Sequence, residues 1–246
     1  MRIALLSDIH ANLGALERCL ADARERGVDR VHFLGDLVGY GAEAAPVLDI
    51  IVSHARSGSI VVKGNHDEAI DEERSYFNHA AKAAIDFARG TLSVEQRRFI
   101  AGLPLIMRDG AACYVHASAF RPERWDYVDS AGAAKACADA AETSYTFCGH
   151  VHDQMLYFES SRGTMSLFRP YPGTAIPVRN HRRWVAIVGS VGQPRDNNPA
   201  AAYAIFDSDR QELTFLRVAY DAASAAQKIR AAKLPEWLAQ RIERGI

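Results

Sequence analysis

The sequence predicts an α/β protein (α+β mixed) in which two mixed β-sheets pack face to face with helices on their outer sides. Strand-like apolar runs alternate with amphipathic helical segments through the first half, whereas hairpin patterns dominate the second half. This change of pattern favours packed sheets over a closed barrel. The 246 residues show no internal repeat and no low-complexity linker, so we expect a single domain over residues 1–246.

The first half is expected to contain three strands separated by helices. Short apolar runs predict the strands, helical spacing of apolar residues predicts the helices, and Gly27 is a plausible C-cap. The Ser93–Gln96 stretch has the form of a capping box. In order, the predicted elements are a strand at Arg2–Leu6, a helix carrying Leu13, Leu16, Leu20 and Ala23, a strand at Val31–Leu34, a helix with Pro46 in its first turn, a strand at Ile60–Val62, a helix over Phe77–Ala88, and a helix from Ser93 to about Leu103.

The second half is expected to be rich in β-structure. Asp109-Gly110 lies between two apolar runs and indicates a hairpin, and Ser130 is placed to cap an alanine-rich helix that ends at Ala141. In order, the predicted strands are Leu105–Met107, Ala112–His116, Tyr145–Cys148, Met155–Glu159, Met165–Phe168, Trp184–Val188, Tyr203–Asp207 and Leu213–Val218, followed by helices that start at Asp221 and, after Pro235, at Glu236–Arg244.

The composition is that of an ordinary soluble protein. Hydrophobic residues make up 48% and charged residues 24%, which excludes intrinsic disorder, and the net charge of −1 offers no footprint for non-specific nucleic-acid binding. The four cysteines lack C-x-x-C spacing, and the apolar runs are too short for a signal peptide or a membrane span. We therefore expect a cytoplasmic protein.

Polar residues that commonly bind metal ions follow several predicted strands at their carboxyl ends, where open α/β sheets hold their ligands. Five of the nine histidines belong to this set. In chain order the motifs are SDIH with Asp8 and His10, GDLVGYG with Asp36, GNHD with Asn65, His66 and Asp67, YVHAS with His116, and FCGHVHD with His150 and His152.

Each of these residues also has a purely structural interpretation. Asp8 could cap a helix, His116 could be a hydrogen-bonded core histidine, and Asn65 could be a turn residue. The ordered series is different, because folding alone does not favour histidine at strand ends. The series as a whole therefore indicates a metal site.

The types of ligand limit the chemistry of such a site. Imidazole and carboxylate without thiolate suit Mn²⁺, Fe²⁺, Co²⁺, Ni²⁺ or Zn²⁺. The set is too large for one tetrahedral ion, and two ions about 3.5–4 Å apart are the usual arrangement for in-line displacement at phosphorus. No G-x-S-x-G or P-loop motif suggests a covalent intermediate.

The series SDIH, GDLVGYG, GNHD, VH and GHVH resembles the calcineurin-like metallophosphoesterases, and the resemblance covers essentially the whole chain. The later stretches GSVGQPRDNNP and LPEWLAQRI are similar to a bacterial and archaeal branch of that superfamily, loosely described as phosphodiesterase-like or diadenosine-tetraphosphatase-like. This resemblance implies a four-layer αββα metallophosphoesterase sandwich.

The resemblance also implies a role for each residue of the series. One ion would be held by Asp8, His10 and His152, Asp36 would bridge to the second ion, and Asn65, His116 and His150 would complete the second site. His66 would face the leaving-group oxygen as a general acid or electrostatic stabiliser, Asp67 would orient His66, and Asn65 would also contact the substrate.

The chain departs from phosphoprotein phosphatases and symmetrical diadenosine tetraphosphatases, which carry an arginine just after the bridging aspartate. The corresponding residues here are Gly39-Tyr40-Gly41. Arg195 is a candidate replacement for binding phosphate, with an ion pair to Asp196 as the alternative. Trp125 and Tyr127 are either a substrate wall beside the site or packing residues.

These observations predict a two-metal phosphoesterase that hydrolyses a small phosphomonoester or phosphodiester through a metal-activated water. Mn²⁺ is the leading ion, with Fe, Ni, Co and Zn as alternatives. A DNA or RNA nuclease of the same superfamily is disfavoured by the net charge of −1, and a non-catalytic binding scaffold is disfavoured by the undamaged motifs. The expected partner is a small phosphorylated substrate rather than nucleic acid or a membrane, and a homo-oligomer stays open.

Overall fold

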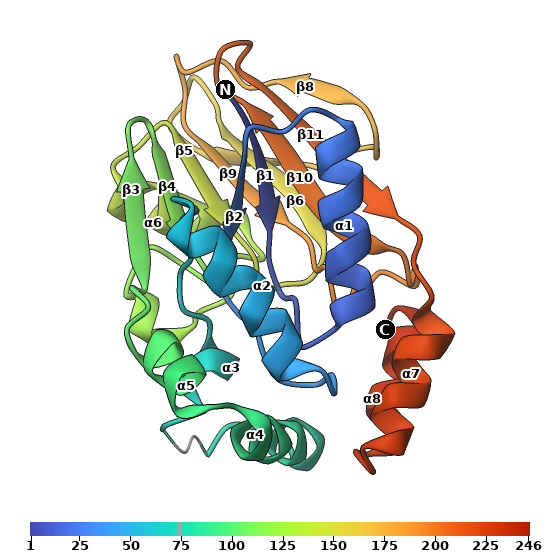
Figure 1. Ribbon diagram of the computed structural model, residues 1–246. Helices are drawn as coiled ribbons and strands as arrows, with labels where there is room; N and C mark the ends of the chain where they lie inside the picture. Colours follow the sequence, from blue (N-terminus) through green and yellow to red (C-terminus); the bar gives the residue numbers. More distant parts are fainter. Residues whose placement is uncertain (73–74) are drawn as a thin grey trace.

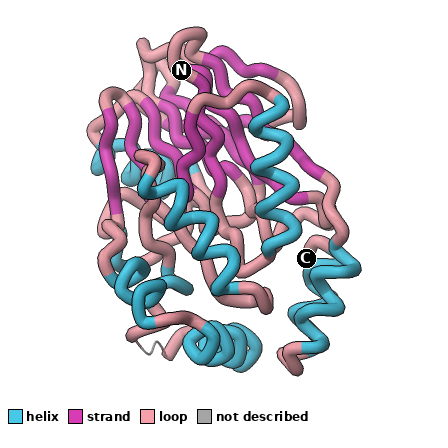
Figure 2. The backbone as a smooth tube through the Cα atoms, viewed as in Figure 1, coloured by secondary structure: helices cyan, strands magenta, loops and turns pink. Residues whose placement is uncertain are grey.

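The computed structural model describes residues 1–72 and 75–246, and its strands form two sheets (Figures 1 and 2). The strands of the first sheet are β1 (Arg2–Leu6), β2 (Arg30–Phe33), β8 (Ala175–Pro177), β10 (Ala201–Asp207) and β11 (Glu212–Val218). They lie in the order β2-β1-β10-β11-β8. β1 and β2 are parallel, and the other neighbours are antiparallel.

The second sheet has six strands in the order β3-β4-β5-β9-β6-β7. Their bounds are β3 (Ile106–Asp109), β4 (Ala112–Val115), β5 (Tyr145–Cys148), β6 (Gln154–Glu159), β7 (Met165–Phe168) and β9 (Trp184–Val188). β4, β5 and β9 run parallel to one another, whereas β3, β6 and β7 each pair antiparallel with a neighbour. The predicted hairpin at Asp109-Gly110 is confirmed, because Asp109 pairs with Ala112 across it.

The two sheets pack face to face, and helices cover their outer faces (Figure 1). In β1, Ile3 and Leu5 point into the core between the sheets, whereas Ala4 and Leu6 pack against the helical layer of α1 (Leu13–Glu25) and α2 (Ala44–Arg56). The outer face of the second sheet is covered by α6 (Ala131–Ala141). This alternation of side chains gives the four αββα layers that the sequence predicted.

The remaining helices gather near the carboxyl ends of the parallel strands. They are α3 (Asn65–Glu68), α4 (His79–Thr91), α5 (Val94–Ala101), the 3₁₀ turn η1 (Pro122–Arg124), α7 (Ala222–Ala231) and α8 (Glu236–Arg244). The predicted capping box at Ser93 is present, and Asp221 caps α7. Ala84 of α4, Ala226 of α7 and Leu238 of α8 share one small core with Tyr40, which brings the C-terminal helices to this end of the molecule (Figure 1).

One predicted strand is wrong, and two short elements of the structure were not expected. Ile60–Val62 is not a strand: it forms one bridge between Phe33 and Val61, and the chain leaves the sheet when Lys63 N bonds to Pro104 O. The short helix α3 and the three-residue strand β8 were not expected, since neither is long enough to show a periodic pattern. Within the described ranges, no helix combines the length and apolar character that crossing a membrane requires.

Candidate active site

The predicted metal ligands converge at one end of the two sheets. Asp8 follows β1, Asp36 follows β2, His116 follows β4, and His150 and His152 follow β5. Parallel pairing places the ends of β1 and β2 together in one sheet and those of β4 and β5 together in the other. All of these side chains are buried.

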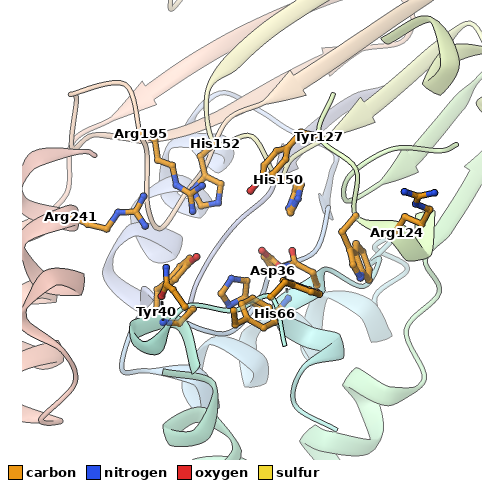
Figure 3. Close-up of a pocket in the computed structure, with 15 residues that line it drawn as sticks. Asp36, Tyr40, His66, Arg124, Tyr127, His150, His152, Arg195 and Arg241 are labelled. Carbon is orange, nitrogen blue, oxygen red and sulfur yellow. Dashed lines mark hydrogen bonds between the residues drawn. The ribbon is translucent and has the colours of Figure 1, made fainter. Parts of the chain in front are cut away.

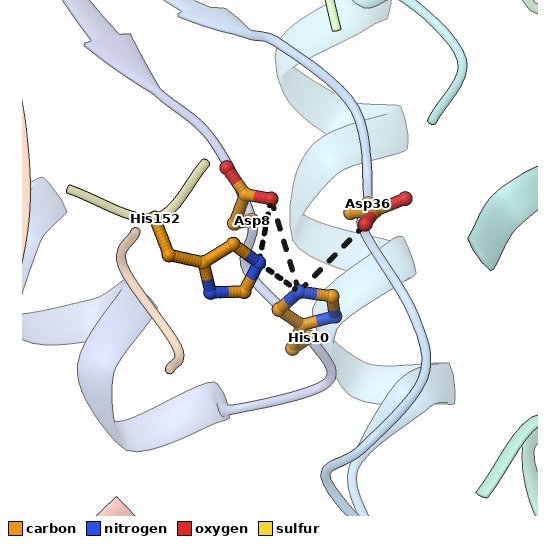
Figure 4. Close-up of side chains that lie close together, drawn as sticks. All are labelled: Asp8, His10, Asp36 and His152. Carbon is orange, nitrogen blue, oxygen red and sulfur yellow. Dashed lines mark hydrogen bonds and ion pairs between the residues drawn. The ribbon is translucent and has the colours of Figure 1, made fainter. Parts of the chain in front are cut away.

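One cluster joins Asp8, His10, Asp36 and His152 (Figure 4). Asp8 Oδ1 lies 3.1 Å from His152 Nε2 and 3.8 Å from His10 Nε2. His10 Nε2 in turn lies 3.2 Å from His152 Nε2 and 3.7 Å from Asp36 Oδ2. Four ligand atoms from three separate parts of the chain therefore surround one small volume.

A second cluster joins Asp36, His116 and His150, with Asn65 beside them. His116 Nε2 lies 3.3 Å from Asp36 Oδ2, 3.1 Å from His150 Nδ1 and 3.2 Å from Asn65 Oδ1. Asp36 is thus common to both clusters. Its other oxygen, Oδ1, accepts the backbone N–H of His66 at 2.8 Å, which fixes the carboxylate between the two sets.

The orientations of the histidine rings show that the Nε2 atoms of His10, His116 and His152 face the two clusters as acceptors. The Nδ1 atoms of His10, His116 and His152 face the carbonyl oxygens of Val38, Leu34 and Gln193 at 3.3, 2.8 and 2.5 Å. A carbonyl only accepts, so each Nδ1 carries a hydrogen, and each Nε2 presents a lone pair to the centre when the ring is neutral. Asp8 Oδ1 is buried there without a hydrogen-bond partner. Converging lone pairs without donors fit divalent cations.

The pKa values of the clustered histidines also indicate that this buried site needs positive charge beside its carboxylates. Burial lowers the pKa of His150 to about 3 and also lowers the pKa values of His10 and His152. Burial acts on His116 in the same direction, but the neighbouring Asp36 carboxylate outweighs it and raises the pKa of His116 to about 9. Without an ion, a proton on His116 therefore balances part of the carboxylate charge.

His66 lies on α3, directly beside the clusters. Its buried ring contacts Tyr40 and Phe77, with centroids 4.4 and 4.8 Å away, and its Nδ1 has no hydrogen-bond partner. A Cβ at Gly39 would lie 2.3 Å from Nδ1, so this edge of the ring is packed on the glycine backbone and Nε2 is left for the cleft. Burial lowers the pKa of His66 to about 4.

The contacts of Asp67, which the resemblance assigns to orienting His66, are made with backbone N–H groups. Its carboxylate accepts the backbone N–H groups of Leu37, Val38 and Gly64 at 2.9, 3.2 and 2.9 Å. Asp67 therefore ties the turn that carries His66 to the loop that carries Asp36. The structure places Asp67 so that it positions His66 through the backbone.

A cleft of about 340 Å³ opens over the clusters (Figure 3). Trp125 and Tyr127, whose roles the sequence left open, line it together with Tyr40, so they face the same space as the clusters. Tyr127 stacks on His150 with centroids 4.2 Å apart, and Trp125 Nε1 donates to Glu68 at 3.0 Å. These contacts form an aromatic wall beside the second cluster.

Arg195 lines the cleft as well, and Asp196, the alternative ion-pair partner considered from the sequence, pairs with another residue. Asp196 forms an ion pair with Arg217, and Nε of Arg195 is buried without a hydrogen-bond partner. Arg241 and Phe77 also reach the cleft but were missed in the sequence. The only signal for Arg241 was its place in the stretch LPEWLAQRI, which is similar to the relatives.

Packed mixed sheets with a buried Asp/His cluster at their strand ends define a metal-dependent hydrolase of phosphoesters. The chain belongs to the calcineurin-like phosphoesterase superfamily, whose domain model matches residues 1–211. It is 33% identical to an uncharacterized protein of Methanocaldococcus jannaschii over 98% of this chain and 96% of that protein.

Two solved structures share the fold over the full length of the chain. A metallophosphoesterase from Sphaerobacter thermophilus is 37% identical, with a TM-score of 0.89 over 100% of this chain and 99% of that one. A hypothetical protein from Pyrococcus horikoshii has a TM-score of 0.80 over 100% and 98% of the two chains, at 20% identity. The resemblance noted in the sequence and the four-layer fold it implied are thereby confirmed.

Proposed function

We propose that the protein is a two-metal phosphoesterase that hydrolyses a small phosphomonoester or phosphodiester. The observation that carries this proposal is the pair of ligand clusters that share Asp36. Asp8, His10 and His152 would hold one ion, and His116, His150 and Asn65 the other. The aspartate between them would bridge the two.

When bound, two divalent cations at such a site supply Lewis acidity and lower the pKa of a water molecule. The donor set contains imidazole, carboxylate and amide oxygen without thiolate, which suits Mn²⁺ first and Fe, Co, Ni or Zn as alternatives. The four cysteines are buried with free thiols and take no part in the clusters. Free thiols fit the reducing cytoplasm that we propose as the location.

His66 is assigned to the leaving group. Its pKa of about 4 means that the free protein holds a neutral imidazole at neutral pH, which can donate a hydrogen bond to the leaving oxygen. The negative charge of a bound phosphate raises the pKa of this imidazole and favours proton transfer. Asp67 holds the turn, and Gly39 provides the surface on which the ring rests.

The protein's own side chains also bind and shield the substrate. Asn65 offers a carboxamide to the oxygens of the scissile phosphate, and Arg195 offers its Nε, which is buried without a hydrogen-bond partner, to an anionic group of the substrate. Trp125, Tyr127 and Phe77 enclose the cleft with apolar surface, which excludes water and strengthens these contacts. The described residues lining the cleft include no Ser, Thr or Cys, in keeping with hydrolysis without a covalent intermediate.

The test is hydrolysis of two chromogenic esters by protein stripped of metal with a chelator. p-Nitrophenyl phosphate reports monoesterase activity and bis-p-nitrophenyl phosphate reports diesterase activity. We expect the stripped protein to be inactive and added Mn²⁺ to restore turnover of at least one ester. Failure of Mn²⁺, Fe²⁺, Co²⁺, Ni²⁺ and Zn²⁺ alike to restore any hydrolysis would contradict the proposal.

A further inference from the structure

One end of the cleft holds two guanidinium groups, which we call the arginine pair (Arg195 and Arg241). Cζ of Arg195 lies 6.0 Å and Cζ of Arg241 5.8 Å from the centroid of the Tyr40 ring. The two side chains come from the loop before β10 and from α8, and both reach the cleft in Figure 3. The π-system of the Tyr40 ring attracts both cations, and it helps to hold them in place.

The arginine pair lacks acidic side-chain partners although carboxylates are close in sequence. Among the described residues, no Asp or Glu carboxylate lies within ion-pair distance of either guanidinium. Asp196 pairs with Arg217, and Glu236 pairs with Arg230. Nε of Arg241 donates to Ile246 O at 2.6 Å, which orients the group, and Nε of Arg195 has no partner.

Two cations held together in a partly buried position repel each other. Burial and the neighbouring Arg195 lower the pKa of Arg241, which shows that the two charges act on one another. Nothing in the packing of α8 requires this arrangement, because the helix is held by apolar contacts of Leu238, Ala239 and Ile242. An anion between the guanidinium groups would relieve the repulsion.

The pair lies at the Tyr40 end of the cleft, where Arg195 comes near His152 of the first cluster (Figure 3). Tyr40 lies next to His10, with ring centroids 4.5 Å apart, and next to both arginines of the pair. In Figure 3 the pair lies at the opposite end of the cleft from Arg124, with Asp36 between them. Arg124 pairs with Asp126 at 3.5 Å, so the arginines at the two ends of the cleft differ: only those of the arginine pair have no Asp or Glu partner.

We propose that the arginine pair recognises a second anionic group of the substrate, a phosphate or carboxylate distinct from the phosphate that is hydrolysed. This inference rests on the proposed function for the position of the scissile phosphate. The substrate class is then a small phosphoester that carries a further negative group on the side of Arg195 and Arg241. The enclosed cleft has the size of a small-molecule site rather than of a nucleic-acid groove.

The test compares three ligands that differ only in the far group: hydroxybutyl phosphate, butanediol bisphosphate and phosphooxybutanoate. Binding to Mn²⁺-loaded and metal-free protein is measured by calorimetry, and phosphate release is measured separately. We expect at least one of the two ligands with an anionic far group, the bisphosphate or the carboxylate, to bind about tenfold or more tightly than the hydroxy compound. Arg241→Gln and Arg195→Gln should each abolish this preference, whereas Arg244→Gln, an exposed arginine on the same helix, should retain it.

The outcomes separate this inference from the proposed function. A preference that disappears in the two variants supports the inference even if no phosphate is released, and in that case only the proposed function fails. Equal binding of all three ligands overturns the inference, whether or not they are hydrolysed. An equal loss of all three ligands in both variants also overturns it, because the pair would then hold the scissile phosphate itself. Should Arg241→Gln not fold, Arg195→Gln decides alone.

Discussion

The substitution Asp36→Asn tests the shared carboxylate on which the two-ion proposal depends. Oδ1 of Asp36 accepts the His66 N–H, and Oδ2 faces His116 and His10 at 3.3 and 3.7 Å. Asparagine has nearly the same shape and can keep the bond to His66 N. Its amide cannot supply the negative charge that two neighbouring cations need. We therefore expect both sites to bind their ions more weakly while the protein keeps its fold.

The expected magnitude follows from linkage between binding and folding. Saturation at about a hundred times the Kd stabilises the folded protein by about 2.7 kcal/mol for each ion. For a chain of this length, each kcal/mol raises Tm by roughly 2–4 °C, so one ion should raise Tm by about 5–11 °C and two ions by about twice that. In Asp36→Asn we expect a rise of less than about half of the wild-type value at the same ion concentration.

Thermal unfolding with and without Mn²⁺ measures the rise, and metal analysis after gel filtration measures the ions held by each chain. Asp139→Asn is the matched control, because it removes an exposed carboxylate that pairs with Lys135 and Arg183 far from the clusters. We expect two ions in the wild type and the control, and fewer than one in Asp36→Asn. Two ions retained by the variant, with an undiminished rise in Tm, would refute the bridging role.

Three further predictions concern the same end of the molecule. His66→Gln should lower kcat about 10²–10⁴-fold at unchanged metal content, as steady-state kinetics can check; an unchanged kcat would remove His66 from the mechanism. Because the pKa of His116 is about 9 without metal, this group is protonated below that pH, so ion binding near neutral pH should release a proton. Calorimetry in buffers of different ionisation heat should see this release fade as the pH rises past about 9, and a pH-independent release would contradict it. Gly39→Ala should lower kcat, because the added Cβ would lie 2.3 Å from His66 Nδ1. Gly110→Ala is the control, since Gly110 also has a positive φ but has no atom within 4 Å of the added Cβ. Equal changes of kcat in the two variants would contradict the clash with His66.

The sequence allowed prediction of those parts of the site that depend on strand direction. Asp8, Asp36, His116 and His150 each follow an apolar strand, and parallel strands end at the same edge. The meeting of Asp8 with Asp36 and that of His116 with His150 could therefore be expected, whereas the meeting of these two pairs depends on how the sheets pack. The layers were predictable for a similar reason, because the alternation of side chains in each strand fixes two buried faces.

Residues that reach the site from helices could not be predicted in this way. Arg241 reaches the cleft because α7 and α8 pack on α4 through contacts between small alanine side chains. No local sequence pattern in α8 predicts this packing. Asp67 was expected to orient His66, but the three backbone donors that hold its carboxylate could not be read from the sequence. In each case the deciding contact joins segments whose relative position depends on tertiary packing.

The backbone at the clusters gives an argument for bound cations that does not depend on ligand type. Five of the seven predicted metal ligands have positive φ: Asp8 54°, His10 49°, Asp36 50°, His150 65° and His152 71°. Each such residue costs about 1–2 kcal/mol, so the five together approach the net stability of an ordinary domain, about 5–15 kcal/mol. Backbone bonds between the loops, from Asp8 N to Gly35 O and from His10 N to Asp36 O, hold this conformation. Glycine would adopt it without the cost but would supply no ligand, so ligand binding by these side chains would offset part of the cost, and we expect folding and ion binding to be coupled in this protein.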